Sequence, residues 1–455
     1  MDSPVPDPSS ASKVDLPALL AVLLGVSVIT LDISLTSTAV PAIAKGIGEV
    51  PARTIWIINV YYLSVVAALL PLAALGEIHG HRRIFFAGLG VFAAGAVVSG
   101  LSGSLPMLTA GRALLGLGSA AVSATTPALI RALYPPEKLG RGLGLYAMVV
   151  GIAFAVGPTA ASAILAVAGW PWLFLLNAPL ALIAVVLAYR GLPHTELNLR
   201  PFDPIAAMLC AVALASLLFA IAGLAHLGWK AATATVVLCA ACGILLQRRE
   251  AGHASPILAL DLFRIRLFLL SSLTSICAFA IQGLVFVVLP FLFQFRLGYT
   301  QVQAGLLITP WPVTLAFMTL ISAPLAVRVA PGVLGSIGLV TVSLGLASLA
   351  MLPGSADSFE ISWRLVFCGV GFGLFQAPNM MAMMSSVPRS RSGGAGGILA
   401  ASRLLGQAIG AGAVAYFVST RPEDGIEASL WFGMALAVMG SVVSIARVLP
   451  QGQRT

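Results

Sequence analysis

The sequence predicts an all-α membrane protein that crosses the bilayer fourteen times. Of its 455 residues, 59% are hydrophobic and only 9% are charged, whereas soluble domains carry roughly 25% charged residues. Apolar runs of about twenty residues, long enough to cross a hydrocarbon core of roughly 30 Å, recur from residue 16 onward. The 46 glycines and 28 prolines are compatible with such helices, because neighbouring helices satisfy the loosened backbone. A lipid bilayer is therefore the expected environment.

Charged and Gly/Pro-rich segments separate the apolar runs. The expected spans lie near 16–44, 54–75, 84–103, 107–133, 142–166, 171–190, 204–225, 229–246, 267–293, 302–327, 332–352, 361–384, 395–418 and 427–448. Their even number places both ends of the chain on the same side of the membrane.

The lysines and arginines predict which side that is. One set of alternate connections, taken with both tails, holds 17 of them and the other set holds 6; two more lie inside spans, which accounts for all 25. Because basic residues gather on the cytoplasmic side, both termini are expected in the cytoplasm. The basic residues occur singly or in pairs rather than in one patch, so no nucleic-acid partner is expected.

The sequence argues against an enzyme or a metalloprotein. All five cysteines lie in apolar runs, and the five histidines lie in loops or at span ends without metal-ligand partners. The chain has no Walker sequence, so ATP-driven transport is not supported. We expect no catalytic residue, no bound metal and no cofactor.

Three ionisable residues fall within the spans: Asp32 in span 1, Arg112 in span 4 and Arg403 in span 13. A bare charge at this depth costs several kcal/mol or more, so such residues are functional candidates by default. Burial and a neighbouring arginine act on the pKa of a carboxyl group in opposite directions, so a site exposed to both can titrate in the working pH range. The alternative is a static pair of Asp32 and Arg112 that only joins two helices.

Several segments, in order along the chain, share a pattern with one transporter family. They are LDISLTSTAVPAI (31–43), LGEIHGHRRIFFAG (75–88), LTAGRALLGLGSAAVSA (108–124), GIAFAVGPTAAS (151–162), WPWLFLLNAPLAL (170–182), PFDPIAAMLCAVALASLLFAI (201–221) and SPILALDLFRIRLF (255–268). Together they resemble the fourteen-helix drug:proton antiporter family of the major facilitator superfamily, and the resemblance covers essentially the whole chain.

The resemblance implies a major facilitator fold made of two six-helix bundles, at 16–190 and 267–448. Two extra membrane helices would lie in the linker 191–266, with cytoplasmic tails at 1–15 and 449–455. A short internal repeat agrees with paired halves, since Pro71-Leu72-Ala73 is echoed by Pro324-Leu325-Ala326. Two such bundles can rock about a central site.

The loop after span 2 is similar to the conserved loop of this superfamily. The resemblance implies a conformational latch made by Glu77, Gly80, Arg82 and Arg83, with Glu77 where the family usually has aspartate. A carboxylate here can hold a helix N-terminus or a nearby arginine. The alternative is simple anchoring by the two arginines on the cytoplasmic side.

Span 5 is similar to the antiporter signature of the superfamily. Gly151, Gly157 and Pro158 carry this resemblance, and the Gly-Pro step is expected to loosen the helix and let a neighbour approach. Ala161 and Ser162 stand where the family has paired glycines, which weakens the signature while keeping small side chains.

The remaining candidates would form the transport path. Asp32 is expected to carry the coupled proton and Arg112 to tune it. Candidate substrate-lining residues are aromatic, amide, thioether or basic side chains in spans: Trp56, Asn59, Tyr62, Gln282, Trp311, Gln376, Asn379, Met380, Arg403 and Gln407. Trp56 equally fits an interfacial belt, and Arg403 equally fits a tie to backbone carbonyls.

The expected function is proton-coupled export of amphipathic, cationic drugs or biocides across a bacterial cytoplasmic membrane, with the proton gradient as energy source. One carboxylate plus aromatic side chains favours organic cations, whereas Arg112 and Arg403 leave open the export of a metabolite or anionic amphiphile. A non-transporting receptor or scaffold is the alternative from another class. The resemblance implies a monomer, with a small-molecule substrate and the bilayer as partners.

Overall fold

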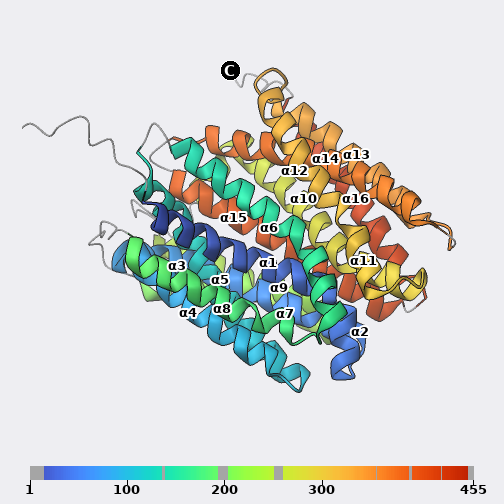
Figure 1. Cartoon of the computed structure of the whole chain (residues 1–455). Helices are drawn as coiled ribbons and strands as arrows, with labels where there is room; N and C mark the ends of the chain where they lie inside the picture. Colours follow the sequence, from blue (N-terminus) through green and yellow to red (C-terminus); the bar gives the residue numbers. More distant parts are fainter. Residues whose placement is uncertain are drawn as a thin grey trace, which may run out of the picture.

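The computed structural model describes residues 15–135, 139–192, 203–250, 260–354, 356–388, 392–421 and 423–448, and helices are the regular elements in these ranges. Apart from Asp15, the two expected tails lie outside the described residues. Figure 1 shows the long helices running side by side as one bundle.

The first part of the chain forms α1 (Leu16–Ile47), α2 (Pro51–Thr54), α3 (Trp56–His79), α4 (His81–Gly100), α5 (Leu105–Leu133), α6 (Leu139–Val167), α7 (Trp172–Leu175), α8 (Asn177–Gly191) and α9 (Pro204–Glu250). The second part forms α10 (Arg266–Phe291), α11 (Gln301–Ile308), α12 (Pro310–Leu325), α13 (Pro331–Ala350), α14 (Ser358–Ser385), α15 (Ser392–Thr420) and α16 (Gly425–Ile445).

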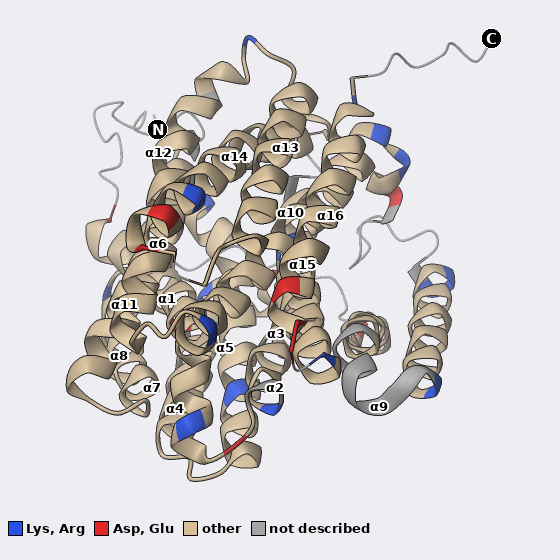
Figure 2. Ribbon diagram, turned by 90° about the vertical axis from the view of Figure 1, so that its right-hand side faces the viewer, with Lys and Arg blue, Asp and Glu red and all other residues tan. Residues whose placement is uncertain are grey.

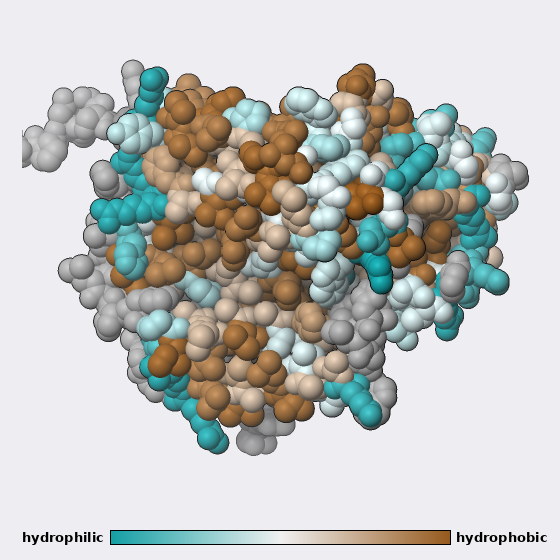
Figure 3. Space-filling model, turned by 90° about the horizontal axis from the view of Figure 1, so that it is seen from below, coloured by the Kyte–Doolittle hydropathy of each residue, from teal (hydrophilic) through white to brown (hydrophobic). Residues whose placement is uncertain are grey.

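Thirteen helices in the described ranges are long and apolar enough to cross a membrane, and Pro204–Ala220 adds a shorter apolar helix. These elements coincide with the fourteen predicted spans. Seen from below, the molecule carries a broad apolar band between two hydrophilic ends (Figure 3), which is the pattern expected where lipid surrounds the middle of the bundle. The prediction of an all-α polytopic membrane protein is therefore confirmed.

Helix α9 is assigned as one element of 47 residues, where the sequence predicts two spans. A straight helix of that length would measure about 70 Å. Its two ends instead meet, since Nε of Arg249 donates to Oδ2 of Asp203 at 2.6 Å. The segments 204–220 and 230–250 are thus two arms that fold back on each other. The second arm, with basic residues at both ends, stands at the outside of the bundle (Figure 2).

The ends of the bundle differ in what they contain. We call the end where α1 begins and α16 ends the tail end; there, the guanidinium of Arg82 donates to the carbonyl oxygen of Tyr189 at the end of α8. Helices α2, α7 and α11 gather at the opposite end, the far end (Figure 1). Helices α10 and α1 are the most deeply enclosed, with 94% and 72% of their apolar windows buried. They form the centre of the second and first halves.

Close helix contact depends on glycine at several crossings. A Cβ at Gly118 of α5 would lie 2.5 Å from the backbone nitrogen of Phe92 and 2.6 Å from the carbonyl oxygen of Gly88, both on α4. Without side chains at these crossings the backbones approach closely, which is how helices associate in lipid. This packing fixes α5, and with it Arg112, against its neighbours.

Candidate functional site

A buried ion pair lies in the first half, between α1 and α5. Nη1 of Arg112 donates to Oδ2 of Asp32 at 2.6 Å, and both side chains are at most 1% exposed. Asp32 is the one buried acid among the described residues. In this conformation the two charges compensate each other, and removal of either would leave a charge without its partner in a low-dielectric interior.

A third side chain, Asn177, completes the surroundings of the carboxylate. Its Nδ2 donates to Oδ1 of Asp32 at 3.0 Å and to the carbonyl oxygen of Leu173 at 3.2 Å. Asn177 begins α8, after the short helix α7. The sequence analysis quoted its segment but did not single it out, because an asparagine near a span end gives no signal of its own.

The guanidinium group of Arg112 also contacts α3, on the side away from Asp32. Its Nε donates to the carbonyl oxygen of Ile57 at 3.4 Å, and its Cζ lies 4.3 Å from the centre of the Tyr61 ring. The hydroxyl of Tyr61 in turn donates to Oγ of Ser119 at 2.9 Å. Arg112 Nη2 has no hydrogen-bond partner within the described chain. The arginine is therefore anchored on α3 and α5, while its carboxylate partner belongs to α1.

Helix α1 also contacts α6 at the Gly-Pro step. Pro158 lacks an N–H, so it leaves the carbonyl oxygen of Phe154, four residues earlier, without its helical donor. The hydroxyl of Ser34 donates to that oxygen at 2.9 Å. A Cβ at Gly157 would collide with the Ser34 side chain, whereas one at Gly151 would meet nothing within 4 Å. Of the signature residues, the Gly-Pro step thus makes the close contact.

Three hydrogen bonds tie the two halves together toward the far end. Nε2 of Gln301 donates to the carbonyl oxygen of Thr38 at 3.2 Å, joining α11 to α1. The hydroxyl of Ser162 lies 3.4 Å from the carbonyl oxygen of Gln301, and the hydroxyls of Thr159 and Thr309 lie 2.8 Å apart. These contacts close the halves against each other at this end.

The loop between α3 and α4 turns at Gly80, whose φ of +95° favours glycine. Arg82 bonds to Tyr189 and lies 5.6 Å from the centre of the Phe86 ring. Arg83 is exposed and Glu77 is half-buried. The four residues of the expected latch thus lie together at the tail end, with Arg82 directed to α8.

In the second half, the amides of Gln282 and Gln407 pair with each other. Nε2 of Gln407 on α15 donates to Oε1 of Gln282 on α10 at 2.9 Å. One turn away, Arg403 is half-buried and its Nε lacks a hydrogen-bond partner among the described residues. It lies within electrostatic reach of Tyr61 and Tyr62. Arg403 therefore lies near the first half, where α15 packs beside α3.

Asn379, one of the expected cavity residues, takes part in a polar network in this conformation. Its Oδ1 accepts from Nη1 of Arg447 at 2.6 Å, and its Nδ2 donates to Oγ of Ser275 at 2.7 Å. Arg447 also donates to Ser271 at 3.0 Å and contacts Ser444. Arg447 is half-buried and has no carboxylate partner among the described residues, so its guanidinium group donates to neutral oxygen atoms instead.

The other expected cavity residues lie in separate places. Trp311 is fully buried, with its ring centre 6.3 Å from that of Phe286 and 6.2 Å from that of Phe372. Met380 is 42% exposed, and Gln376 is half-buried with an unpaired Oε1. In the described part of the chain, the ten candidates thus do not form one continuous lining in this conformation.

Comparison with known proteins identifies the family. A family model described as the Major Facilitator Superfamily matches residues 22–411. The chain belongs to this superfamily. The uncharacterized transporter YebQ of Escherichia coli strain K12 is 41% identical over 95% of both chains. The multidrug resistance protein Stp of Mycobacterium tuberculosis is 29% identical over 88% of this chain and 75% of its own length.

Solved structures agree on the fold. The crystal structure of a D-xylose-proton symporter superposes with a TM-score of 0.69 at 14% sequence identity, covering 95% of this chain and 97% of the other. Membership of the superfamily, together with the apolar helices, makes this protein a multi-pass membrane transporter. The resemblance noted in the sequence is confirmed at the level of the superfamily, and Stp shows that drug-resistance transporters are among its relatives.

Proposed function

We propose that this transporter exports amphipathic small molecules by proton-coupled antiport and alternating access. The observation that carries the proposal is the buried pair of Asp32 and Arg112, joined at 2.6 Å. A buried ion pair is a costly way to join helices, since apolar packing achieves the same without desolvating two charges. Its presence between α1 and α5 is better explained by a step of the transport cycle in which the pair opens.

Protonation of Asp32 is that step in our proposal. A proton on the carboxylate removes the negative charge that compensates Arg112, which weakens the contact between the two side chains. Arg112 remains held by Ile57 and Tyr61. When the contact weakens, Arg112 therefore stays in place and α1, the helix that carries Asp32, is the element free to move.

Helix α1 can pass this change to the far end. Ser34, two residues after Asp32, bonds to α6, and the carbonyl of Thr38, one turn further, accepts from Gln301 on α11. A shift or rotation of α1 that follows opening of the ion pair disturbs both contacts. Proton binding would in this way favour opening of the end that is now closed, which is a two-state switch of the kind transporters use.

The structure favours one of two coupling schemes. In the first, Asp32 binds a proton and a cationic substrate in turn; in the second, the proton acts as a switch and substrate binds elsewhere. Asp32 is fully buried and both carboxylate oxygens accept hydrogen bonds. This enclosure supports the second scheme.

Cationic amphiphiles are the first substrate class we propose. Asp32 is the buried acid among the described residues, and its protonation makes the interior more positive, which disfavours a bound cation and so yields exchange. The alternative is an anionic amphiphile or metabolite. Arg403 favours it, because its half-buried guanidinium has an Nε without a partner in the described residues.

We also propose a bacterial cytoplasmic membrane and a monomer, with both termini in the cytoplasm. The basic excess of 17 over 6 residues in alternate connections supports this orientation. The far end, with α2, α7 and α11, would then face outward. Reporter fusions after residues 190 and 296 should give cytoplasmic and external signals, respectively; reversed signals would contradict the orientation.

Efflux from cells tests the proposed function. Cells that express the wild type should accumulate less of at least one compound from a panel of matched organic cations and anions. A protonophore should abolish this difference, and so should Asp32→Asn. Asp203→Asn, which changes a partly exposed acid outside the site, serves as the matched control and should export normally. Export that survives the protonophore would contradict proton coupling.

A further inference from the structure

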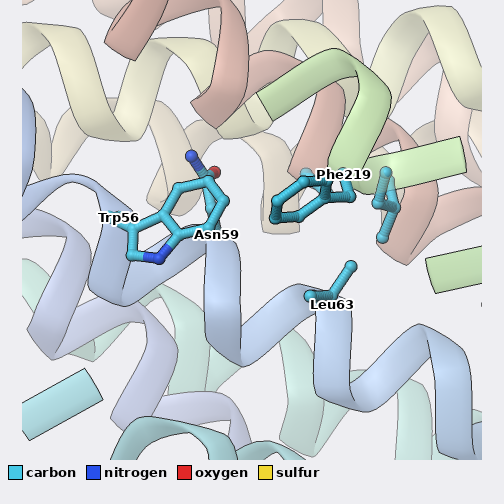
Figure 4. A pocket seen from close by; sticks show the side chains of 6 residues that line it. Trp56, Asn59, Leu63 and Phe219 are labelled. Atoms are coloured by element: carbon cyan, nitrogen blue, oxygen red, sulfur yellow. The ribbon is translucent and has the colours of Figure 1, made fainter. Parts of the chain in front are cut away.

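Three asparagine side chains are buried in the described part of the chain, and their surroundings differ. Asn59 borders a free space of about 10 Å³ between α3, α9 and α15, which is room for one water molecule (Figure 4). Asn379 accepts from Arg447 at 2.6 Å. Asn177 is the one of the three that donates to a carboxylate, at 3.0 Å from Oδ1 of Asp32. Its amide group therefore acts directly on the candidate proton site.

The joint between α7 and α8 places Asn177 beside Asp32. Helix α7 ends at Leu175 and α8 begins at Asn177, and α8 then packs along α1. The side chain is 1% exposed, and its Nδ2 also donates to the carbonyl oxygen of Leu173 in α7 at 3.2 Å. Both acceptors need an N–H group, so together they fix the orientation of the amide.

Few other groups act on the charge of Asp32. Arg112 of α5 is the charged side chain that acts on it in the described residues, and it bonds to the other carboxylate oxygen, Oδ2. Tyr61 of α3 lies within electrostatic reach and directs its hydroxyl to Ser119. Helices α2, α6, α7, α8, α10 and α11 also pack against α1, and their described residues bring no charged group to the carboxylate. Asn177 is thus the second polar partner of Asp32.

The hydrogen bond from Asn177 favours the charged form of Asp32. An amide N–H donates more strongly to a carboxylate than to an uncharged carboxyl group. Protonation at Oδ2 therefore weakens this bond. Protonation at Oδ1 forces the amide to turn so that its oxygen accepts the O–H, which also breaks the contact with Leu173. In either case the proton binds at the expense of a contact made by Asn177.

We propose that Asn177 is a positioning residue for proton coupling, which sets the pH at which Asp32 takes up its proton. The inference rests on the proposed role of Asp32 as the coupling site. Without the amide, Asp32 takes up its proton from a more alkaline solution, and the switch operates over a different pH range. The same Nδ2 bonds to Leu173, so the amide also links the proton site to α7 at the far end.

Infrared difference spectroscopy of the purified full-length protein in lipid tests this role without any substrate. The C=O stretching band of protonated carboxyl groups is followed through a pH titration, and the part that is missing from Asp32→Asn belongs to Asp32. In Asn177→Leu, which keeps the size of the side chain, the midpoint of this part should move to higher pH by at least about one unit, the effect of losing one hydrogen bond to a charged group. The pH profile of substrate-evoked proton movement should shift in the same direction.

Two further variants keep the test decisive. Asn177→Ser carries a shorter side chain that stops short of Oδ1, so its midpoint should rise as well, even if Asn177→Leu does not fold. Gln294→Leu removes a half-buried amide outside the site and should titrate like the wild type.

The outcomes separate this inference from the proposed function. Unchanged midpoints in both Asn177 variants would overturn the inference and leave Asp32 as the proton site. An equal shift in Gln294→Leu would overturn it as well, because the effect would then not depend on contact with Asp32. A titration in which Asp32→Asn lacks no part of the band would overturn the proposed proton site itself, and the inference with it.

Discussion

The hydroxyl group of Ser34 on α1 donates to the carbonyl oxygen of Phe154 on α6 at 2.9 Å. This oxygen is the one that Pro158 leaves without a helical donor, because it belongs to the residue four positions earlier. The Gly-Pro step of α6 therefore does more than loosen a helix. It exposes an acceptor that a neighbouring helix uses, two residues from the candidate proton site.

We expect Ser34→Ala to destabilise the folded protein by about 1–3 kcal/mol, because the part-buried carbonyl of Phe154 loses the hydrogen bond from this hydroxyl. Pro158→Ala restores an N–H to α6, so the double variant should recover most of the loss. A double-mutant cycle of chemical unfolding in detergent measures this coupling. Strictly additive effects of the two substitutions would show that the hydroxyl and the proline act independently.

Asn379 should affect stability and not substrate recognition. In Asn379→Leu the guanidinium of Arg447 loses its acceptor at 2.6 Å, and we expect a loss of about 1.5–3 kcal/mol, typical of a hydrogen bond to a charged group. The KM for any transported compound should stay unchanged. A raised KM at normal stability would indicate that Asn379 contacts the substrate.

The closure at the far end should depend on the paired threonine hydroxyls. Thr159→Val and Thr309→Val each remove the 2.8 Å contact and should shift the population toward the open far end by up to about tenfold. The double variant should shift it no further than either single variant. Spin labels at Arg53 and Leu306, both exposed residues of far-end helices, would report the change as a longer distance. Equal distances in all variants would contradict this role.

The contact between the arms of α9 should weaken in acid. The hydrogen bond from Arg249 lowers the pKa of Asp203 below its ordinary value, with a further contribution from the backbone N–H of Ala206. The stabilisation is thus present above the unfolded-state pKa of about 3.9 and is lost as the pH falls through the lower folded-state value. It is small because the pair is exposed.

The measurement for this pair is the Tm of wild type and Asp203→Asn over a pH series. Any difference between them at neutral pH should shrink as the pH falls below the unfolded-state pKa of about 3.9, and it should disappear once the carboxyl of folded Asp203 is also protonated. High salt should reduce it at neutral pH. A difference that grows on acidification would contradict the pairing.

The sequence predicted the spans well because the bilayer sets both the length of the apolar runs and the position of the charged residues that bound them. It also suggested that Asp32 pairs with Arg112, since two opposite charges in apolar helices have few other partners. The two spans expected at 204–225 and 229–246 are found as the two arms of α9; the sequence did not show that the ends of these arms meet through Arg249 and Asp203.

The detailed site depended on tertiary contacts that one sequence does not encode locally. Asn177 lies 145 positions from Asp32, and Ser34 lies 120 positions from Phe154. Small polar residues such as these are common in membrane helices, so neither stood out. The expected cavity list was based on residue type alone; in this conformation Trp311 is fully buried and Asn379 is hydrogen-bonded to Arg447, and the substrate role of both stays a prediction.

Proton release from proteoliposomes tests the central claim most directly. An inward pH gradient is imposed, and a transported compound found in the efflux panel is added to wild type, to Asp32→Asn and to the control Asp203→Asn. The account predicts substrate-evoked proton movement in wild type and control, and none in Asp32→Asn, with all three proteins equally folded. Proton movement that persists in Asp32→Asn would contradict the assignment of Asp32 as the coupling site.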